Sequence, residues 1–371
     1  MPDVIVIGLG SMGSAAAYHL ASRGASVLGV DRFTPPHTRG AHSGGTRIIR
    51  MTYAEGSAYV PLLRRAYALW DQMSETIGER LVTPTGGLFL GPAASGTVAG
   101  ALRSAREHGL GHELLDACEI RRRFPAFTPA DDDVAVYDEA AGIVTPEAAI
   151  SALLGLASAA GASLRYGSAV ASWKASETSV AVTLADGTVL TADRLIVAPG
   201  GWAAGLLGLP INLQRRVQHY WTPAGTGYAP GQFPVWIWED AAGIAGYGMP
   251  EFGPDRWVKA AFHHADDPAS PDAGAAAVRP GEEAPMRSWL RHRLPGIATA
   301  RYAGGRECLY ALTPDEHFVI GRHPAWDRVA VAAGFSGHGF KFVPIVGEIL
   351  ADLSTGVAPS YDLSLFAPGR F

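Results

Sequence analysis

The chain has 371 residues, which is longer than one ordinary domain and predicts about two domains. A hydrophobic fraction of 48% and a charged fraction of 18% are typical of a globular protein with a large core and exclude a disordered chain. The net charge of -5 argues against nucleic acid as a partner, and no apolar run reaches the about 18 residues of a membrane span. With Cys118 and Cys308 as its only cysteines and no signal-peptide pattern, the sequence predicts a cytoplasmic protein without a disulfide framework.

The first element is a short strand that ends in a glycine-rich turn. Apolar residues 4–7 predict a strand buried on both faces, and Gly8-x-Gly10-x-x-Gly13 leads at once into an alanine-rich helix. The first glycine permits the turn, the second lets a pyrophosphate approach the backbone, and the third allows close packing of helix on strand. The helix N-terminus offers free N–H groups to phosphates. Taken alone, the motif also fits a glycine turn that binds nothing.

The next strand supplies the context that favours binding. Residues 27–30 predict this strand, and it ends at Asp31, close to the ~20-residue offset of an acid that accepts from ribose hydroxyls. The alternative interpretation of Asp31 is a turn residue after a strand. Strand, glycines, helix, strand and acid together predict a dinucleotide site for NAD or FAD rather than NADP.

A loop rich in proline and glycine separates this unit from the arginines Arg47 and Arg50. If their segment were helical, the two arginines would lie on neighbouring positions and present their charges together, although two surface arginines explain the pattern equally well. Later in the chain, the Asp186-Gly187 hairpin and a buried strand from Arg194 into glycines favour an FAD domain over an NAD dehydrogenase. The sequence also predicts helices over 59–73, 116–124 and 146–160, and strands over 86–91, 163–166, 169–174, 180–184 and 188–190.

The composition changes between residues 213 and 309, where aromatic residues and alternating patterns predict an antiparallel sheet. Its aromatic side chains could wall a pocket or fill a core. Lys259 alternates with apolar neighbours and would point into a cavity, where a lysine is rare without a function. Nearer the end, three glycines of the turn 334–342 precede a helix, so that backbone N–H groups and Lys341 could stabilise negative charge on a flavin ring.

These motifs together resemble those of the monomeric sarcosine oxidase and N-methyltryptophan oxidase family of FAD-dependent amine oxidases, of the D-amino-acid-oxidase-like superfamily. Beyond the glycine motif, the resemblance is carried by residues 44–50, 247–250, 313–318 and 334–342. It implies a mixed α/β fold, in which a Rossmann-like FAD-binding domain is interleaved with a substrate domain built on an antiparallel sheet. The implied FAD-binding domain comprises residues 1–85, 145–212 and 310–371, and the substrate domain comprises 86–144 and 213–309.

The resemblance also implies a role for individual residues. Cys308 would hold the flavin covalently by a thioether at its 8α carbon, and Arg50 and Lys341 would clamp the substrate carboxylate. Among the implied catalytic residues Lys259, Arg47 and His263, the lysine would lie above the flavin through a water and promote its reaction with oxygen. Tyr247 and His263 would line the substrate pocket, and Arg47 would lie near the opposite face of the flavin. The residues implied for FAD binding are Gly8, Gly10, Ser11, Met12, Gly13, Asp31, Arg32, His42, Thr46, Val170, Cys308, Gly337, His338, Gly339 and Lys341.

The implied reaction removes a hydride equivalent from the carbon next to a secondary amine, after which the imine hydrolyses and oxygen is reduced to hydrogen peroxide. The chain departs from the family at Ser43 and Gly45, where relatives commonly have histidine and aspartate; this could alter flavin attachment, redox potential or oxygen reactivity. The substrate stays open between sarcosine, an N-methyltryptophan-like compound and a larger or cyclic amino acid. A dehydrogenase, a tailoring oxidase of natural-product amines and a non-catalytic nucleotide-binding protein are the alternatives. We expect a monomer with no metal and no membrane or nucleic-acid partner.

Overall fold

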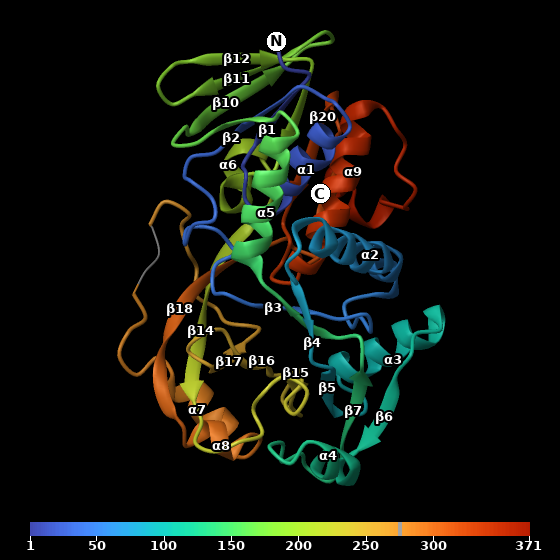
Figure 1. Cartoon of the computed structure of the whole chain (residues 1–371), viewed down its shortest axis with the longest axis vertical. Coiled ribbons are helices and arrows are strands. Elements are labelled where there is room, and N and C mark those ends of the chain that lie inside the picture. Colours follow the sequence, from blue (N-terminus) through green and yellow to red (C-terminus); the bar gives the residue numbers. More distant parts are fainter. Residues whose placement is uncertain (274–276) are drawn as a thin grey trace.

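The computed structural model describes residues 1–273 and 277–371, and its two largest sheets in these ranges occupy opposite halves of the molecule (Figure 1). The first sheet has the order β19-β20-β13-β1-β2-β9 and is parallel except for β19, which runs antiparallel to β20. Its strands are β1 (Val4–Ile7), β2 (Val27–Val30), β9 (Ser163–Arg165), β13 (Arg194–Val197), β19 (Val319–His323) and β20 (Trp326–Ala333).

Both faces of this sheet are covered, as the apolar run of β1 predicts. Val4 and Val6 belong to the core shared with helices, whereas Ile5 and Ile7 pack with the small meander β10-β11-β12. Strands buried on both faces lack a polar alternation, which explains the continuous apolar pattern. Helices α1 (Ser11–Ser22) and α9 (Val343–Thr355) pack on the strands, and α5 (Pro146–Ala159) and α2 (Val60–Ile77) pack in turn on α1 and α9, respectively. The meander strands are β10 (Val170–Ala175), β11 (Val180–Leu184) and β12 (Val189–Ala192).

The second sheet has the order β18-β14-β17-β16-β15-β5-β7-β6 within the described residues. All its neighbouring strands are antiparallel except β15 and β5, which pair in parallel, so the antiparallel prediction is right for most of this sheet. Its strands are β5 (Gly87–Pro92), β6 (Glu113–Asp116), β7 (Asp133–Asp138), β14 (Asn212–Thr222), β15 (Val235–Glu239), β16 (Ala245–Phe252), β17 (Trp257–Phe262) and β18 (Arg301–Leu312).

Most aromatic residues of this region fill a core instead of walling a pocket. Trp221, Trp236 and Trp238 are buried in one cluster with Trp289 of α7, on one face of the sheet. Tyr247 belongs to a different cluster, which contains the apolar residues of the opposite face. Alternation along the strands separates the two sets, because successive side chains point to opposite faces of a sheet.

The segment that carries Arg47 and Arg50 is a strand, so the conditional helix is wrong. β3 (Arg47–Ile49) pairs antiparallel with β8 (Gly142–Val144), which also pairs with β4 (Val82–Pro84). Two consecutive isoleucines favour this extended conformation, since β-branched side chains pack well on a pleated surface. Arg50 follows the end of β3, and Asp138 accepts hydrogen bonds there from the N–H groups of Met51 and Thr52 at 2.8 and 2.9 Å.

Apart from α3, the other helices are short. They are α3 (Gly96–His108), α4 (Ala117–Arg123), α6 (Ala203–Leu207), α7 (Ala284–Leu290) and α8 (Pro295–Ala298), with 3-10 turns η1 (Ser57–Tyr59), η2 (Gly200–Trp202), η3 (Phe340–Phe342), η4 (Ser364–Phe366) and η5 (Pro368–Arg370). Asp116 caps α4 as its sequence predicts, by accepting from the Glu119 N–H, and Cys118 of this helix is exposed.

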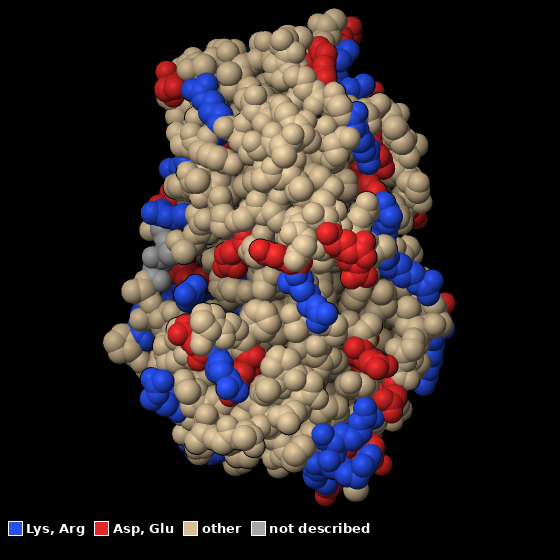
Figure 2. Space-filling model, in the orientation of Figure 1, with Lys and Arg blue, Asp and Glu red and all other residues tan. Residues whose placement is uncertain are grey.

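The arginines of α4 form a basic cluster near the lower edge of Figure 2. Each of them pairs with a carboxylate: Arg121 with Asp131, Arg122 with Glu119 and Arg123 with Glu113. In the described parts of the chain, no helix has the length and apolar character to cross a membrane.

Candidate functional site

The glycine motif forms a close-packed turn at the end of β1. Gly8 has a φ of 84°, and a Cβ there would lie 2.3 Å from the Ala198 carbonyl oxygen. A Cβ at Gly13 would lie 1.7 Å from the Gly8 carbonyl oxygen, so the first helical turn rests directly on the strand end. Gly10 is the N-cap of α1 and has no side chain that could occupy the free N–H groups. Gly10, Ser11 and Met12 line the adjoining cavity, so the free N–H groups of this first turn offer an anion site there.

Asp31 lies beside this turn. Its carboxylate accepts hydrogen bonds from the Leu9 and Phe33 N–H groups at 2.7 and 2.8 Å, and burial raises its pKa. The Leu9 contact joins the end of β2 to the glycine turn, which sequence reasoning did not foresee. One oxygen can still accept from a sugar hydroxyl, because a carboxylate offers about four lone-pair sites.

A cavity of about 390 Å³ runs along the carboxyl ends of the first sheet, where ligands bind in open α/β sheets. Its lining joins the glycine turn to the turn before α9 and includes these residues expected at FAD: Gly8, Gly10, Ser11, Met12, Asp31, Arg32, His42, Val170, Gly337 and Gly339. The glycine cradle, the helix N-terminus and the acid fit a dinucleotide. Gly13, Thr46, Lys259 and Cys308 do not line either of the two cavities described here. Thr46 and Cys308 are each joined by a hydrogen bond to Arg47, which lines both cavities, and Lys259 is joined to Thr46.

Arg47 connects the loop before β3 to Cys308. Its Nη2 donates to the carbonyls of Ala41 and Ser43 at 2.6 and 2.7 Å and lies 3.3 Å from the Cys308 Sγ. Cys308 is buried, with an exposed fraction of 2%. The Cys308 thiol also lies 3.5 Å from the Ala41 carbonyl oxygen, to which it can donate, so the cysteine is held against the loop before β3.

The departures from the family pattern lie in the same loop. Gly44 and Gly45 donate their N–H groups to one carboxylate oxygen of Glu147, each at 3.0 Å, and Glu147 comes from the first turn of α5. The carbonyls of Gly44 and Thr46 accept from the Lys259 Nζ at 2.6 and 3.0 Å. Burial, followed by the charge of Arg47, lowers the pKa of Lys259 well below its ordinary value.

A second cavity of about 320 Å³ adjoins the first, since Arg47, Tyr310, Gly337 and Phe340 line both. The structure brings together here the residues expected to bind substrate, which come from the ends of β3 and β17, from β16 and from η3 before α9. They are Arg50, Tyr247, His263 and Lys341, and Glu55, His264 and His338 also line this cavity.

Arg50 and Glu55 form an ion pair in this second cavity. Arg50 Nη2 contacts both carboxylate oxygens of Glu55 at 2.5 Å, and the guanidinium lies over the rings of Tyr53 and Phe89. Burial alone would raise the pKa of Glu55, but Arg50 lowers it to about 2. Arg50 itself is 2% exposed, so this cavity holds a buried guanidinium whose charge is paired with Glu55.

Lys341 and the two histidines of the cavity are also strongly shifted. Lys341 Nζ donates to the His338 carbonyl at 2.7 Å, and burial together with Arg50 lowers its pKa to about 7. Burial lowers the pKa of His263 to about 3 and that of His338 to about 4, so both are neutral near pH 7. No acidic or basic cluster suited to hold a metal occurs among residues 1–273 and 277–371.

Known proteins resemble this chain over its whole length. The family model described as FAD dependent oxidoreductase (DAO) matches residues 3–353. The chain belongs to this family of FAD-dependent oxidoreductases. A monomeric sarcosine oxidase of Streptomyces avermitilis is 45% identical over 99% of this chain and 97% of the relative, and an N-methyl-L-tryptophan oxidase of Yersinia pestis is 36% identical over 100% and 99%. Among solved structures, NikD, an unusual amino acid oxidase essential for nikkomycin biosynthesis, superposes with a TM-score of 0.86 at 26% identity, covering 99% of this chain and 97% of NikD.

Membership of the family confirms the mixed α/β fold, the dependence on FAD and the class of enzyme inferred from the motifs. Sequence reasoning missed the residues that hold the site residues in place, above all Glu55, Glu147 and Asp138. Asp138 and Glu147 accept from backbone N–H groups far away in the sequence, and Glu55 pairs with an arginine five residues before it in an irregular segment, so no local motif marks these contacts. Glu147 alone gave a signal, since an acid in the first turn of a helix is favoured by the helix dipole.

Proposed function

We propose that this protein oxidises a secondary amino acid, in the first place an N-methyl amino acid such as sarcosine or a larger relative. The main support is that Arg50 and Lys341 line the same cavity, which adjoins the dinucleotide cavity. A planar guanidinium and an ammonium group suit one amino-acid carboxylate. The resemblance to sarcosine oxidase and N-methyl-L-tryptophan oxidase supports the same class of substrate.

The residues of the cavity would orient the substrate and keep its amine uncharged. Arg50, Lys341 and Arg47 place positive charge around the amine and lower its pKa, which frees the nitrogen lone pair as the C–H bond breaks. His263 and Tyr247 complete the wall and exclude water. FAD held along the glycine turn and Asp31 would supply the acceptor for the hydride equivalent, and the two electrons with two protons would reduce oxygen to hydrogen peroxide. Water then adds to the imine, giving an aldehyde and the free amino acid.

The proposal includes a covalent flavin on Cys308 and a role for Lys259 in the oxygen reaction. The position of Cys308 supports the covalent link, since its Sγ contacts Arg47, a residue of the dinucleotide cavity wall. A negative charge next to the Lys259 Nζ would raise its pKa again and favour the protonated form that assists oxygen. The two-domain division, the monomer and the cytoplasmic location are parts of the same proposal.

A tailoring oxidase of a natural-product amine is the second candidate, and the structural match to NikD favours it. The identity to NikD is 26%, against 45% to the sarcosine oxidase, so we place the N-methyl amino acids first. The discriminating experiment mixes the FAD-loaded enzyme anaerobically with sarcosine, N-methyl-L-tryptophan and L-proline and records the loss of flavin absorbance near 450 nm for each. Fast bleaching by an N-methyl amino acid is expected. Bleaching only by cyclic imino acids would favour the second candidate, and no bleaching by any of them would refute the proposal.

The same preparation tests the covalent link. After precipitation with acid, yellow colour in the pellet is expected for a flavin bound to Cys308. Colour released into the supernatant would contradict the link and indicate that Ser43 and Gly45 have changed the flavin site. A Cys308→Ser variant provides the matched non-covalent control.

A further inference from the structure

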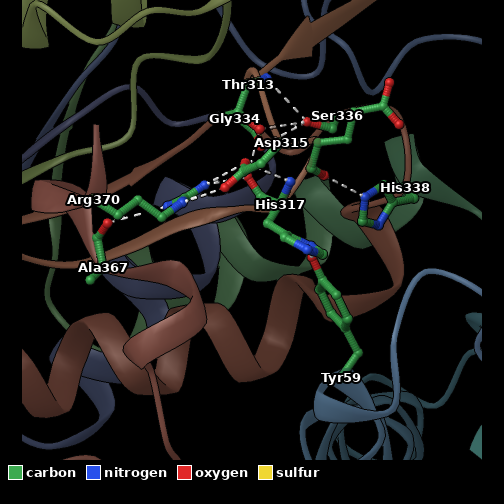
Figure 3. Close-up of polar contacts among 10 residues, drawn as sticks. Tyr59, Thr313, Asp315, His317, Gly334, Ser336, His338, Ala367 and Arg370 are labelled. Atoms are coloured by element: carbon green, nitrogen blue, oxygen red, sulfur yellow. Dashed lines mark hydrogen bonds and ion pairs between the residues drawn. The ribbon is translucent and has the colours of Figure 1, made fainter.

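An arginine of η5 holds the turn that follows β18 (Figure 3). Arg370 Nε and Nη2 donate to the carboxylate oxygens of Asp315 at 2.8 and 3.0 Å, and Nη2 also donates to the His317 carbonyl at 2.8 Å. The hydrogen bonds from Arg370 lower the pKa of Asp315 to about 2, so the pair is charged at neutral pH. We call Arg370, Asp315 and His317 the Arg370 clasp.

Arg370 donates hydrogen bonds to both chain neighbours of Glu316, a residue with a strained backbone. Glu316 has a φ of 58°, in the left-handed region that residues other than glycine seldom adopt. Further hydrogen bonds close the turn, from the Glu316 N–H to the Thr313 carbonyl at 3.1 Å and from the Thr313 hydroxyl to the His317 carbonyl at 2.7 Å. A strained backbone persists only where its surroundings hold it, and the clasp is the charged part of those surroundings.

The strained residue contacts the substrate cavity through its backbone. The Glu316 carbonyl lies 3.1 Å from His338 Nε2, which must therefore carry the proton and donate it, and His338 Nδ1 accepts from the Tyr53 hydroxyl at 2.6 Å. Figure 3 shows the His338 ring turned toward this carbonyl. His338 lines the substrate cavity, and its own carbonyl accepts from the Lys341 Nζ.

We propose that Arg370 is a positioning residue for substrate binding. Its hydrogen bonds to Asp315 and His317 keep Glu316 in the left-handed conformation. In that conformation the Glu316 carbonyl orients His338, and His338 in turn orients the Lys341 ammonium. This inference rests on the proposed function, in which Lys341 binds the substrate carboxylate. Loss of the clasp lets the turn relax toward a right-handed conformation, and the carbonyl then turns away from His338.

The test compares Arg370→Gln, Arg370→Lys and a control, Arg322→Gln. Arg322 of β19 donates to the Asp327 carbonyl and takes no part in the clasp. For Arg370→Gln we expect KM for the best amino-acid substrate, and Kd for acetate as a simple carboxylate, to rise about tenfold, while kcat changes less. Arg370→Lys should recover part of the affinity, because it restores one charged donor. A lower melting temperature with unchanged KM and Kd would assign Arg370 a structural role only and overturn the proposal.

The same substitution in a protein that carries Glu316→Gly tests whether the strain at Glu316 matters. Glycine adopts the left-handed conformation at little cost, so in a Glu316→Gly protein the turn should keep its shape without the clasp. We therefore compare the Glu316→Gly protein with the Glu316→Gly, Arg370→Gln double variant. Between these two proteins, the rise in acetate Kd should shrink to about twofold. An equal rise in the two backgrounds would overturn the proposal. Failure of the unsubstituted enzyme to bind acetate or oxidise any secondary amino acid would instead refute the proposed function.

Discussion

Arg50 and Glu55 form a buried ion pair in the cavity where we propose that the substrate carboxylate binds. Both oxygens of Glu55 contact one nitrogen of Arg50 at 2.5 Å, which leaves other N–H groups of the guanidinium to other partners. One of these, on Nη1, donates to the Thr52 carbonyl at 3.1 Å. A carboxylate ligand thus meets a guanidinium whose charge is already partly balanced by Glu55.

Replacing Glu55 by glutamine should strengthen carboxylate binding. The change removes a negative charge next to the substrate carboxylate but keeps a side chain that can accept a hydrogen bond, so we expect KM and the Kd for acetate to fall about threefold to tenfold. Glu239→Gln is the matched control, because Glu239 lines the same cavity but accepts from the N–H groups of Gly96 and Thr97. A weaker affinity in Glu55→Gln would show that Glu55 mainly holds Arg50 in place.

The affinity for carboxylates should fall as the pH rises. Lys341 has a pKa of about 7, so its charged form is lost from the free site above that pH, whereas bound carboxylate favours the charged form and raises the pKa. Acetate Kd should therefore rise by up to about tenfold per pH unit above 7, and binding at pH 8 should take up a proton, which calorimetry in buffers of different ionisation enthalpy detects. The nearby His263 and His338 stay neutral in this range. A Lys341→Met variant should lose the pH dependence, and retention of the full slope in that variant would contradict the assignment.

Replacing Lys259 by methionine should separate the two half-reactions. Methionine fills a similar volume without a charge, so anaerobic flavin reduction by substrate should stay within about twofold, while reoxidation by oxygen should slow by about a hundredfold or more. Stopped-flow absorbance measures the two rates separately. Reoxidation at the normal rate would rule out the proposed role of Lys259.

The glycine motif should be intolerant of a single methyl group at Gly13. A Cβ there would lie 1.7 Å from the Gly8 carbonyl oxygen, so Gly13→Ala must displace α1 from β1 and should destabilise the protein by about 3 kcal/mol. Gly155→Ala is the control, since Gly155 lies inside α5 and a Cβ there would meet nothing within 4 Å. This control should stabilise the helix by about 0.5–1 kcal/mol. Urea unfolding measures both, and equal stabilities would refute the close packing of the motif.

Local patterns in the sequence predicted those parts of the fold that local interactions determine. The run before Gly8, the cap at Asp116 and the turn at Asp186-Gly187 each depend on residues within a few positions, and the structure has the expected elements there. The strand at Arg47 could not be distinguished from a helix, because its pairing partner at Gly142 is distant in the sequence. Which face of a sheet a side chain is buried on also depends on contacts with segments distant in the sequence.

For the candidate site, the motifs located the cationic residues, but not the anions that surround them. Arg50 and Lys341 follow from the resemblance and lie in one cavity. Glu55 and Glu147 come from a loop and a helix start, where acids are common, and only the folded chain places them next to Arg50 and the loop at Gly44. Such carboxylates can be identified from the groups that they contact in the structure, but not from their spacing in the sequence.

The most direct test of the central claim measures oxygen consumption by the FAD-loaded enzyme with an N-methyl amino acid and with the primary amide of the same compound. The account predicts that oxygen is consumed with an equal amount of hydrogen peroxide for the acid, and that kcat/KM for the amide is at least about a hundredfold lower, because Arg50 and Lys341 lose a charged partner. In an Arg50→Gln variant the acid and the amide should become nearly equal. Equal kcat/KM values for acid and amide in the unsubstituted enzyme, or no oxidation of either, would contradict the account.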